Sequence, residues 1–236
     1  MIFTGERVIE GVTPQRIWIE HVKRYEFASA FIKNMKGGLT LDIACGTGYG
    51  CKILSNKGNI PEIIGVDISR EAISFACANY KTAEIEFVIG DAVNLPFSKE
   101  KFDYVVCFET LEHIKTPEKM LQELRRILKS NGLLIISTPN RKLTSPGKSI
   151  RDQPDNPYHI VEYSTNEFIR LLSKYFEVLE VYGQRGISKF YLIPVFEKIL
   201  RIMFPTLYAP ERYSCELEKI RSTKEYRYIV AICKKQ

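Results

Sequence analysis

The chain has 236 residues, of which 45% are hydrophobic and 26% are charged, and this composition excludes the disordered and collagen-like classes. Its net charge of +6 is carried entirely by residues 185–236, which hold 11 Lys and Arg against 5 Glu; this segment either faces an anionic partner or forms a solvated surface. The six cysteines form no CxxC pair and the N-terminus shows no signal-peptide pattern, so we expect reduced thiols and a cytoplasmic location.

An N-terminal helical segment is predicted over residues 1–38. Thr13 and Pro14 resemble an N-cap followed by proline at the first helical position, and Gly37 and Gly38 end the helix. Strands and helices then alternate. We expect strands at 39–44, 63–66, 85–89, 102–108, 133–137, 176–182 and 226–233, with helices after residues 48, 69, 116 and 164. Asn131 and Gly132 are expected to end the helix that begins after residue 116.

This alternation predicts a single α/β domain with a doubly wound, Rossmann-like, mostly parallel sheet. The cofactor-binding core is expected at 39–183. Within it, residues 139–163 contain four prolines and form a loop that we expect to cover the active site. An insertion at 184–224 is expected as a lid or dimer surface, and residues 225–236 as the last strand.

The loop after the first predicted strand, LDIACGTGYG at residues 41–50, contains Gly46 and Gly48. In an open α/β sheet, a glycine loop at this place forms the floor of the ligand site. A dinucleotide fingerprint would need another glycine at position 51, which is Cys51, and no Gly-Lys-Ser or Gly-Lys-Thr follows. The loop therefore disfavours NAD, FAD and ATP.

Carboxylates accompany four successive predicted strands: Asp42 lies within the first, and Asp67, Asp91 and Glu109 follow the next three. Each acid alone could be a helix cap or a turn residue, but together they would repel a triphosphate. S-adenosylmethionine carries an ammonium, a sulfonium, a ribose diol and an adenine amine, which carboxylates can face or accept hydrogen bonds from. The set therefore favours this cationic cofactor.

Five segments in order, LDIACGTGYG, IIGVDIS, IGDAVNLPF, FDYVVCFETLEHI and LKSNGLLIISTPN, resemble the class I S-adenosylmethionine-dependent methyltransferases over at least residues 39–138. The resemblance implies a seven-stranded sheet with one antiparallel strand, Tyr226 to Cys233, and S-adenosylhomocysteine as product. It places the methionine part on the Asp42–Gly48 loop, the ribose on Asp67 and the adenine on Asp91 with Ala92. The full set of implied cofactor contacts is Asp42, Ala44, Cys45, Gly46, Thr47, Gly48, Asp67, Ile68, Asp91, Ala92, Phe108 and Glu109, with Arg24 and Tyr25.

Glu109, Glu112 and His113 form an ExxEH cluster after the fourth strand, and His159 lies in the long loop. Glu112, His113 and His159 are the candidate catalytic residues, because a hydroxyl acceptor benefits from a base or a metal. The cluster resembles the metal-binding residues of small-RNA 3′-end 2′-O-methyltransferases and ubiquinone-pathway O-methyltransferases. That resemblance implies Glu109, Glu112, His113 and His159 as ligands of Mg²⁺ or Mn²⁺. Alternatively, the cluster is the turn found in metal-free members of the class.

The segments TGERVIEG, EHVKRYEFA and NPYHIVEY resemble bacterial and archaeal methyltransferases associated with sugar or glycan modification. By this resemblance Arg24 and Tyr25 close over the cofactor, with Arg24 facing the methionine carboxylate; the alternative is a solvated helix face. Residues 190–210 are apolar but interrupted by charges and prolines, which excludes a membrane-spanning helix. Residues 190–204 could form core or homodimer packing, an acceptor lid or a membrane-surface helix.

These observations predict an O-methyltransferase that acts on a small hydroxylated and anionic acceptor, a sugar or glycan precursor. Two alternative acceptors are a quinone-pathway phenol and an RNA ribose, although nucleic acid is the less favoured partner. A different class of function is a regulator that binds S-adenosylmethionine without turnover.

Overall fold

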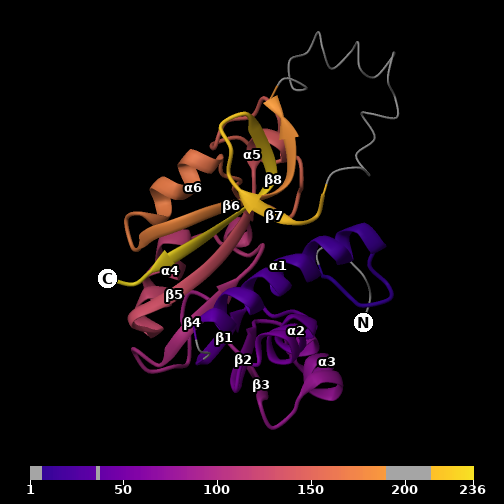
Figure 1. Cartoon of the computed structure of the whole chain (residues 1–236), viewed down its shortest axis with the longest axis vertical. Coiled ribbons are helices and arrows are strands. Elements are labelled where there is room, and N and C mark those ends of the chain that lie inside the picture. Colours follow the sequence, from indigo (N-terminus) through magenta and orange to yellow (C-terminus); the bar gives the residue numbers. More distant parts are fainter. Residues whose placement is uncertain (1–6, 36–37, 190–213) are drawn as a thin grey trace.

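The computed structural model describes residues 7–35, 38–189 and 214–236. These residues form one sheet with helices on both faces (Figure 1). In chain order the elements are α1 (Gln15–Asn34), β1 (Leu39–Ile43), α2 (Tyr49–Gly58), β2 (Glu62–Asp67), α3 (Arg70–Tyr80), β3 (Ile85–Ile89), β4 (Phe102–Cys107), the short 3₁₀ helix η1 (Leu111–His113), α4 (Pro117–Ile127), β5 (Leu128–Pro139), α5 (Arg141–Thr144), α6 (Thr165–Leu172), β6 (Glu177–Ser188), β7 (Leu217–Lys219) and β8 (Lys224–Lys234).

The strand order is β3-β2-β1-β4-β5-β8-β6-β7. The strands from β3 to β5 are parallel, and β8 lies antiparallel between β5 and β6. The doubly wound, mostly parallel fold and the antiparallel strand at 226–233 are thus confirmed. The expected number of strands was wrong: a short eighth strand, β7, pairs antiparallel with the end of β6, so the described sheet has two strands that run against the others.

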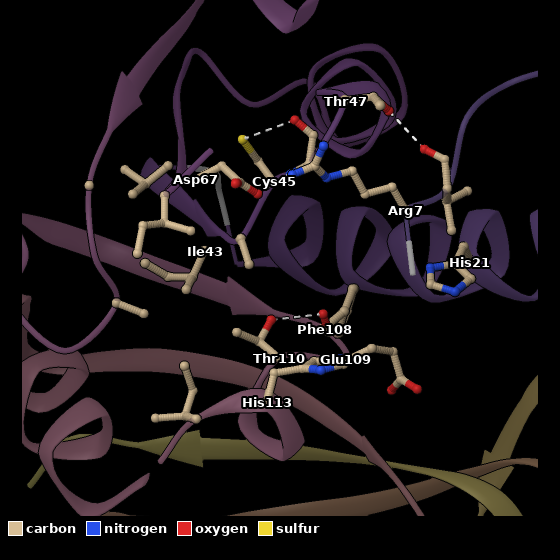
Figure 2. A pocket seen from close by; sticks show the side chains of 18 of the residues that line it. Arg7, His21, Ile43, Cys45, Thr47, Asp67, Phe108, Glu109, Thr110 and His113 are labelled. Atoms are coloured by element: carbon tan, nitrogen blue, oxygen red, sulfur yellow. Dashed lines mark hydrogen bonds between the residues drawn. The ribbon is translucent and has the colours of Figure 1, made fainter. Parts of the chain in front are cut away.

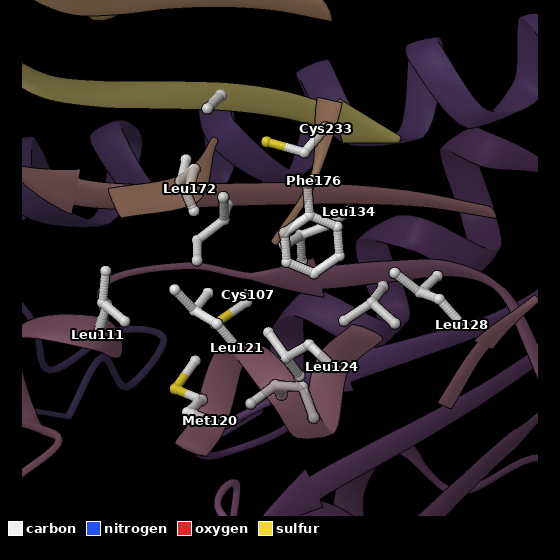
Figure 3. Close-up of a cluster of buried hydrophobic side chains, with 14 of the residues drawn as sticks. Cys107, Leu111, Met120, Leu121, Leu124, Leu128, Leu134, Leu172, Phe176 and Cys233 are labelled. Carbon is white, nitrogen blue, oxygen red and sulfur yellow. The ribbon is translucent and has the colours of Figure 1, made fainter. Parts of the chain in front are cut away.

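Side-chain alternation along the strands divides the core into two layers. In β2, Ile64 and Val66 pack with α4 and α6, whereas Ile63 packs with α1, α2 and α3. Figure 3 shows the first layer, in which Met120, Leu121 and Leu124 of α4 lie beneath the sheet. Asp42 lies between Leu41 and Ile43 of β1 and therefore faces the layer that contains α1.

Local signals explain most of the element boundaries. Ser69 accepts a hydrogen bond from the amide of Ala72 and caps α3, and Ser164 and Glu167 form the capping box that begins α6. The helix predicted to begin at Pro14 begins one residue later, and the Thr13 hydroxyl accepts a hydrogen bond from the amide of Ile9 instead of capping α1.

One predicted boundary was wrong. Asn131 and Gly132 do not end α4, which stops at Ile127, but lie within β5. Asn131 adopts a left-handed conformation with φ 64°, and the two residues exchange backbone hydrogen bonds with Lys235 beside β8. Pairing with the last strand therefore extends β5 toward its beginning and shortens the helix.

The segments expected as loop and insertion contain regular structure. The loop at 139–163 includes the four-residue helix α5. The insertion expected at 184–224 is shorter, because β6 continues through Ser188 and residues 217–219 form β7. The proposed lid, dimer or membrane-surface segment at 190–204 lies outside the described residues. Among the helices that the structure describes, none is long and apolar enough to cross a membrane.

Candidate active site

A cavity of about 470 Å³ opens at the carboxyl ends of β1, β2, β3 and β4, a size that suits a cofactor. In Figure 2, Cys45 and Asp67 lie on one side of it, and Phe108, Glu109 and His113 lie on the other. It is lined by these residues named from the sequence as contacts: Tyr25, Ala44, Cys45, Gly46, Thr47, Asp67, Ile68, Asp91, Ala92, Phe108, Glu109 and His113.

The glycine loop has an unusual backbone, because Ala44, Gly46 and Gly48 all have positive φ values. A Cβ atom on Gly46 would meet nothing within 4 Å, whereas one on Gly48 would lie 2.8 Å from side-chain atoms of Ala76 and Phe87. Gly46 therefore borders the cavity. Gly48 does not line it and instead allows α2 to approach α3 and the sheet closely.

Asp67 anchors this loop to β2. One carboxylate oxygen accepts a hydrogen bond from the amide of Gly46 at 3.0 Å, and the other accepts one from Ser69 at 2.8 Å. Because a carboxylate offers about four acceptor sites, each oxygen retains capacity for a ligand hydroxyl. Asp91 lies further along the cavity, exposed, with one oxygen accepting from the amide of Val93.

Asp42 lies behind the cavity wall and does not line it. The Tyr25 hydroxyl donates to this carboxylate and is 3.1 Å from both oxygens, and Cys51 lies 3.4 Å from one of them. Burial raises the pKa of Asp42 to about 7. The carboxyl group therefore fixes Tyr25, whose ring lines the cavity and packs edge-on against Phe108 and Tyr49.

Glu109 and Glu112 occupy different environments after β4. Glu109 lines the cavity, has φ 49°, and accepts a hydrogen bond from the Ser137 hydroxyl at 2.5 Å. Glu112 is only 1% exposed, and its carboxylate accepts from the Thr138 hydroxyl at 3.2 Å. Burial, reinforced by the charge of Glu109, raises the pKa of Glu112 well above its usual range.

His113 and His159 meet edge to face, with ring centroids 4.9 Å apart. Nδ1 of His113 lies 3.0 Å from the carbonyl oxygen of Tyr158, to which it donates, so Nε2 is the basic nitrogen of the neutral ring. His159 contacts the Glu162 carboxylate through Nδ1 at 2.6 Å and the Asn156 amide through Nε2 at 2.8 Å. The long loop thus orients both imidazoles.

Glu112, His113 and His159 offer ligand atoms within 4.8 Å of one another. Histidines whose Nδ1 is held by a carbonyl or a carboxylate are typical of metal sites, so these three residues are of the right kinds for Mn²⁺ or Mg²⁺. His159 would have to exchange Asn156 for the ion. Glu109 is not in this group and bonds to Ser137 instead.

Several lining residues were not identified from the sequence as site residues. His21 contacts the Tyr49 hydroxyl at 3.1 Å, and burial, reinforced by the charge of Arg24, lowers the pKa of His21 well below its usual range. Val8 accepts a hydrogen bond from Thr47 and ties the N-terminal segment to the glycine loop. The sequence carries no local signal for these long-range contacts. The others are Arg7, Ile43, Tyr49, Val66, Gly90, Thr110, Ile114 and Tyr158.

Arg24 is absent from the lining. Its side chain is fully buried, and Nη1 donates to the Gln184 side chain at 2.6 Å. Gln184 in turn donates to the carbonyl oxygens of Glu20 and Cys215. Arg24 and Gln184 therefore fasten α1 to β6.

Known proteins with related sequences are methyltransferases. The profile of a family described as a methyltransferase domain matches residues 41–136. A Mycolicibacterium smegmatis protein named "Probable S-adenosylmethionine-dependent methyltransferase" is 31% identical over 182 residues, 76% of this chain and 67% of that protein. A Mycobacterium tuberculosis protein with the same description is 30% identical over 173 residues, which cover 73% of this chain and 60% of its own length. A ubiquinone biosynthesis O-methyltransferase of Glaesserella parasuis is 32% identical over 123 residues, 48% of this chain and 51% of that protein.

Solved structures share the fold at lower identity. A Pyrococcus horikoshii protein superposes with a TM-score of 0.65 at 22% identity, covering 100% of this chain and 97% of its own. A [4+2]-cyclase superposes with a TM-score of 0.59 at 18% identity, covering 89% and 81%. Because a fold hosts more than one chemistry, these neighbours show the architecture alone. The sequence relationships, together with the carboxylate-lined cavity after a glycine loop, show that this chain belongs to the class I S-adenosylmethionine-dependent methyltransferases.

Proposed function

We propose that this methyltransferase transfers the methyl group to a hydroxyl of a small, anionic acceptor, such as a sugar or glycan precursor. The observation that carries the proposal is the hydrogen bond between His113 Nδ1 and the Tyr158 carbonyl at the edge of the cavity. With Nδ1 donating to this carbonyl, Nε2 is the basic nitrogen of the ring, which supports a role for His113 in accepting the proton of an acceptor hydroxyl.

The cavity residues fit S-adenosylmethionine. We expect Asp67 to accept from the ribose hydroxyls, Asp91 with Ala92 and Ile68 to contact the adenine, and the residues from Ala44 to Thr47 to hold the methionine part. When bound, the cofactor supplies a methyl group on a sulfonium that leaves as a neutral thioether. The rings of Tyr25, Tyr49 and Phe108 surround this part of the cavity, and aromatic rings attract cations.

His113 then acts as a general base. With the cofactor bound, the acceptor hydroxyl would give its proton to Nε2 of His113 as its oxygen takes up the methyl group. Tyr158 accepts the hydrogen bond from Nδ1 and stabilises the imidazolium that forms. Since the sulfonium is already a good leaving group, much of the rate enhancement comes from holding the two reactants in position.

The chemistry of the acceptor is supported by two observations. The likeness to ubiquinone biosynthesis O-methyltransferases is compatible with a hydroxyl acceptor. The group of arginines beside the cavity, described below, favours an acceptor that carries negative charge. A quinone-pathway phenol is the second candidate acceptor, because that same likeness extends over about half of the chain.

An acceptor screen with radiolabelled methyl donor tests this function. The panel contains neutral sugars, carboxylated and phosphorylated sugars, phenols, amines and RNA. We expect transfer to hydroxyl groups, with the anionic sugars preferred over the matched neutral ones. Transfer only to amines, or only to RNA, would contradict the proposal.

The Glu112, His113 and His159 cluster suggests a second way to activate the hydroxyl. These three residues would hold Mg²⁺ or Mn²⁺, and the cation would supply positive charge that favours the deprotonated acceptor. We favour the metal-free base because both ring nitrogens of His159 already have hydrogen-bond partners within the covering loop.

A further inference from the structure

Arg24 is a buried cation whose charge is not neutralised by any described carboxylate. Its side chain is 0% exposed, and its guanidinium lies 4.7 Å above the ring of Tyr228. Gln184 accepts from Nη1, but Nε and Nη2 have no hydrogen-bond partner. Buried polar groups nearly always have partners, and a buried charge without one is especially costly. The unpaired donors therefore indicate a place for an anion.

Arg185 of β6 lies close enough to the same tyrosine and to Arg227 for the charges of these groups to act on its guanidinium. Gln184 pairs with Tyr228 and Gly186 pairs with Tyr226, so the register places Arg185 opposite Arg227, and Arg185 has φ 56°. Arg185 bonds to Glu20 at 2.9 Å, yet its Nε is buried and has no partner.

Arg227 adds a third guanidinium from β8. It lies 6.0 Å from the centre of the Tyr228 ring, and its Nε is also buried without a partner. The carboxylate of Glu20 is shared between Arg185 and Arg16. Within the described part of the chain, none of the ion pairs contains Arg24 or Arg227. Three guanidinium groups therefore lie around Tyr228, which the charges of Glu109 and Glu20 also reach.

This group of arginines lies next to the cavity. On α1, Arg24 follows His21 by one helical turn and precedes Tyr25, and both of these neighbours line the cavity. Tyr228 is close enough to Glu109 for the charge of this carboxylate, together with burial, to raise the pKa of the tyrosine. Glu109 is itself a lining residue close to His113 in sequence and space.

We propose that Arg24, Arg185 and Arg227 bind a carboxylate or phosphate group of the methyl acceptor. Planar guanidinium groups bind both oxyanions with paired, charge-assisted hydrogen bonds, and the unpaired Nε atoms supply donors of this kind. The anionic group would hold the acceptor while one of its hydroxyls approaches His113. This inference rests on the proposed function, because it assigns the specificity of the same site.

The test uses the full chain saturated with S-adenosylhomocysteine, so that the cofactor's own carboxylate is already bound. Calorimetric titrations with inorganic phosphate and with acetate compare the wild type with Arg24→Gln, Arg185→Gln and Arg227→Gln. Arg125→Gln, an exposed residue on α4, is the matched control. Circular dichroism establishes that each variant is folded, and Arg227→Gln, which lies on a partly exposed position, guards against loss of folding in Arg24→Gln.

We expect at least one of the two anions to bind the saturated protein. Arg24→Gln and Arg227→Gln should each weaken that binding by roughly 10-fold, while Arg125→Gln leaves it unchanged. The anion that binds more tightly, phosphate or acetate, indicates whether the site prefers a phosphate or a carboxylate group. Absence of binding by the wild type, or equal binding by Arg227→Gln and wild type, would overturn the inference. Competition between phosphate and S-adenosylhomocysteine would also overturn the inference, because it would indicate that Arg24 binds the cofactor. Failure of S-adenosylhomocysteine to bind at all would instead overturn the proposed function.

Discussion

The Tyr25 hydroxyl lies 3.1 Å from both carboxylate oxygens of Asp42, and this contact links α1 to β1 directly behind the cavity. The first strand thus contributes an acid that supports an aromatic wall residue. Because Tyr25 and Asp42 are both buried, the protonation state of the acid affects the stability of the fold.

Asp42→Asn should change how stability depends on pH. The pKa of Asp42 is about 7 in the folded protein and about 4 in an unfolded chain. Between these values the folded state retains a proton that the unfolded state has lost, so the contribution of this group to stability falls as pH rises from about 4 to about 7.

Chemical denaturation of the wild type and Asp42→Asn across this range measures the effect. The difference in free energy of unfolding should change by about 1 kcal/mol per pH unit in favour of the variant. Glu86→Gln, an exposed change on β3, serves as control. A difference that does not vary with pH would show that Asp42 is ionised in the folded protein throughout.

Gly50 is required by Tyr25. A Cβ atom at residue 50 would lie 2.2 Å from Cζ of Tyr25, whereas one at Gly46 would meet nothing within 4 Å. We expect Gly50→Ala to lower the free energy of unfolding by roughly 1–3 kcal/mol and to displace the tyrosine ring. Gly46→Ala should cost only about 1–2 kcal/mol, because alanine is strained at φ 54°.

Denaturation and ligand titration together distinguish the two glycines. Gly46→Ala should lower the free energy of S-adenosylhomocysteine binding by more than it lowers the free energy of unfolding, since its methyl group would enter the cavity. Equal stability of Gly50→Ala and the wild type would show that the tyrosine has room to move.

His113→Gln tests the catalytic base. Loss of a general base reduces turnover by roughly 10²–10⁴-fold, and glutamine preserves a polar side chain of similar reach. We expect kcat to fall within this range with the first active acceptor, while the affinity for S-adenosylhomocysteine changes little. Retention of wild-type kcat would exclude His113 as the base.

Treatment with a chelator distinguishes the general-base mechanism from the metal-assisted mechanism. Under the favoured mechanism, methyl transfer in excess EDTA should stay within about twofold of the untreated rate, since removal of a true catalytic metal would cost several kcal/mol. His159→Ala should show the same insensitivity. Loss of activity in EDTA, restored by Mn²⁺ in the wild type but not in His159→Ala, would establish the cation site instead.

The sequence alone predicted the parts of this site that depend on the order of strands and helices along the chain. The alternation of strands and helices predicted the sheet, and acids after successive strands predicted that Asp67, Asp91 and Glu109 lie at one cavity, because parallel strands end at the same edge. The strand pattern also explains why Asp42 faces the layer that contains α1: its neighbours Leu41 and Ile43 face the other layer of the core.

Contacts between distant parts of the chain were beyond such reasoning. Arg24 and Gln184 are 160 residues apart, and the pairing of β6 with β8 places Arg185 opposite Arg227. The role of Tyr25 in reaching Asp42 depends on the close approach of α1 to α2 at Gly50. Periodicity predicts which face of an element is buried, but it does not predict which buried groups become partners.

Calorimetry with S-adenosylhomocysteine and NAD tests the central claim, that the cavity binds an adenosyl cofactor through Asp67. We expect one S-adenosylhomocysteine per chain and no comparable binding of NAD. Asp67→Asn, which keeps an acceptor for the Gly46 amide, should weaken S-adenosylhomocysteine by at least roughly 10-fold, and Glu86→Gln should not. Preference for NAD, or unchanged affinity in Asp67→Asn, would contradict the account.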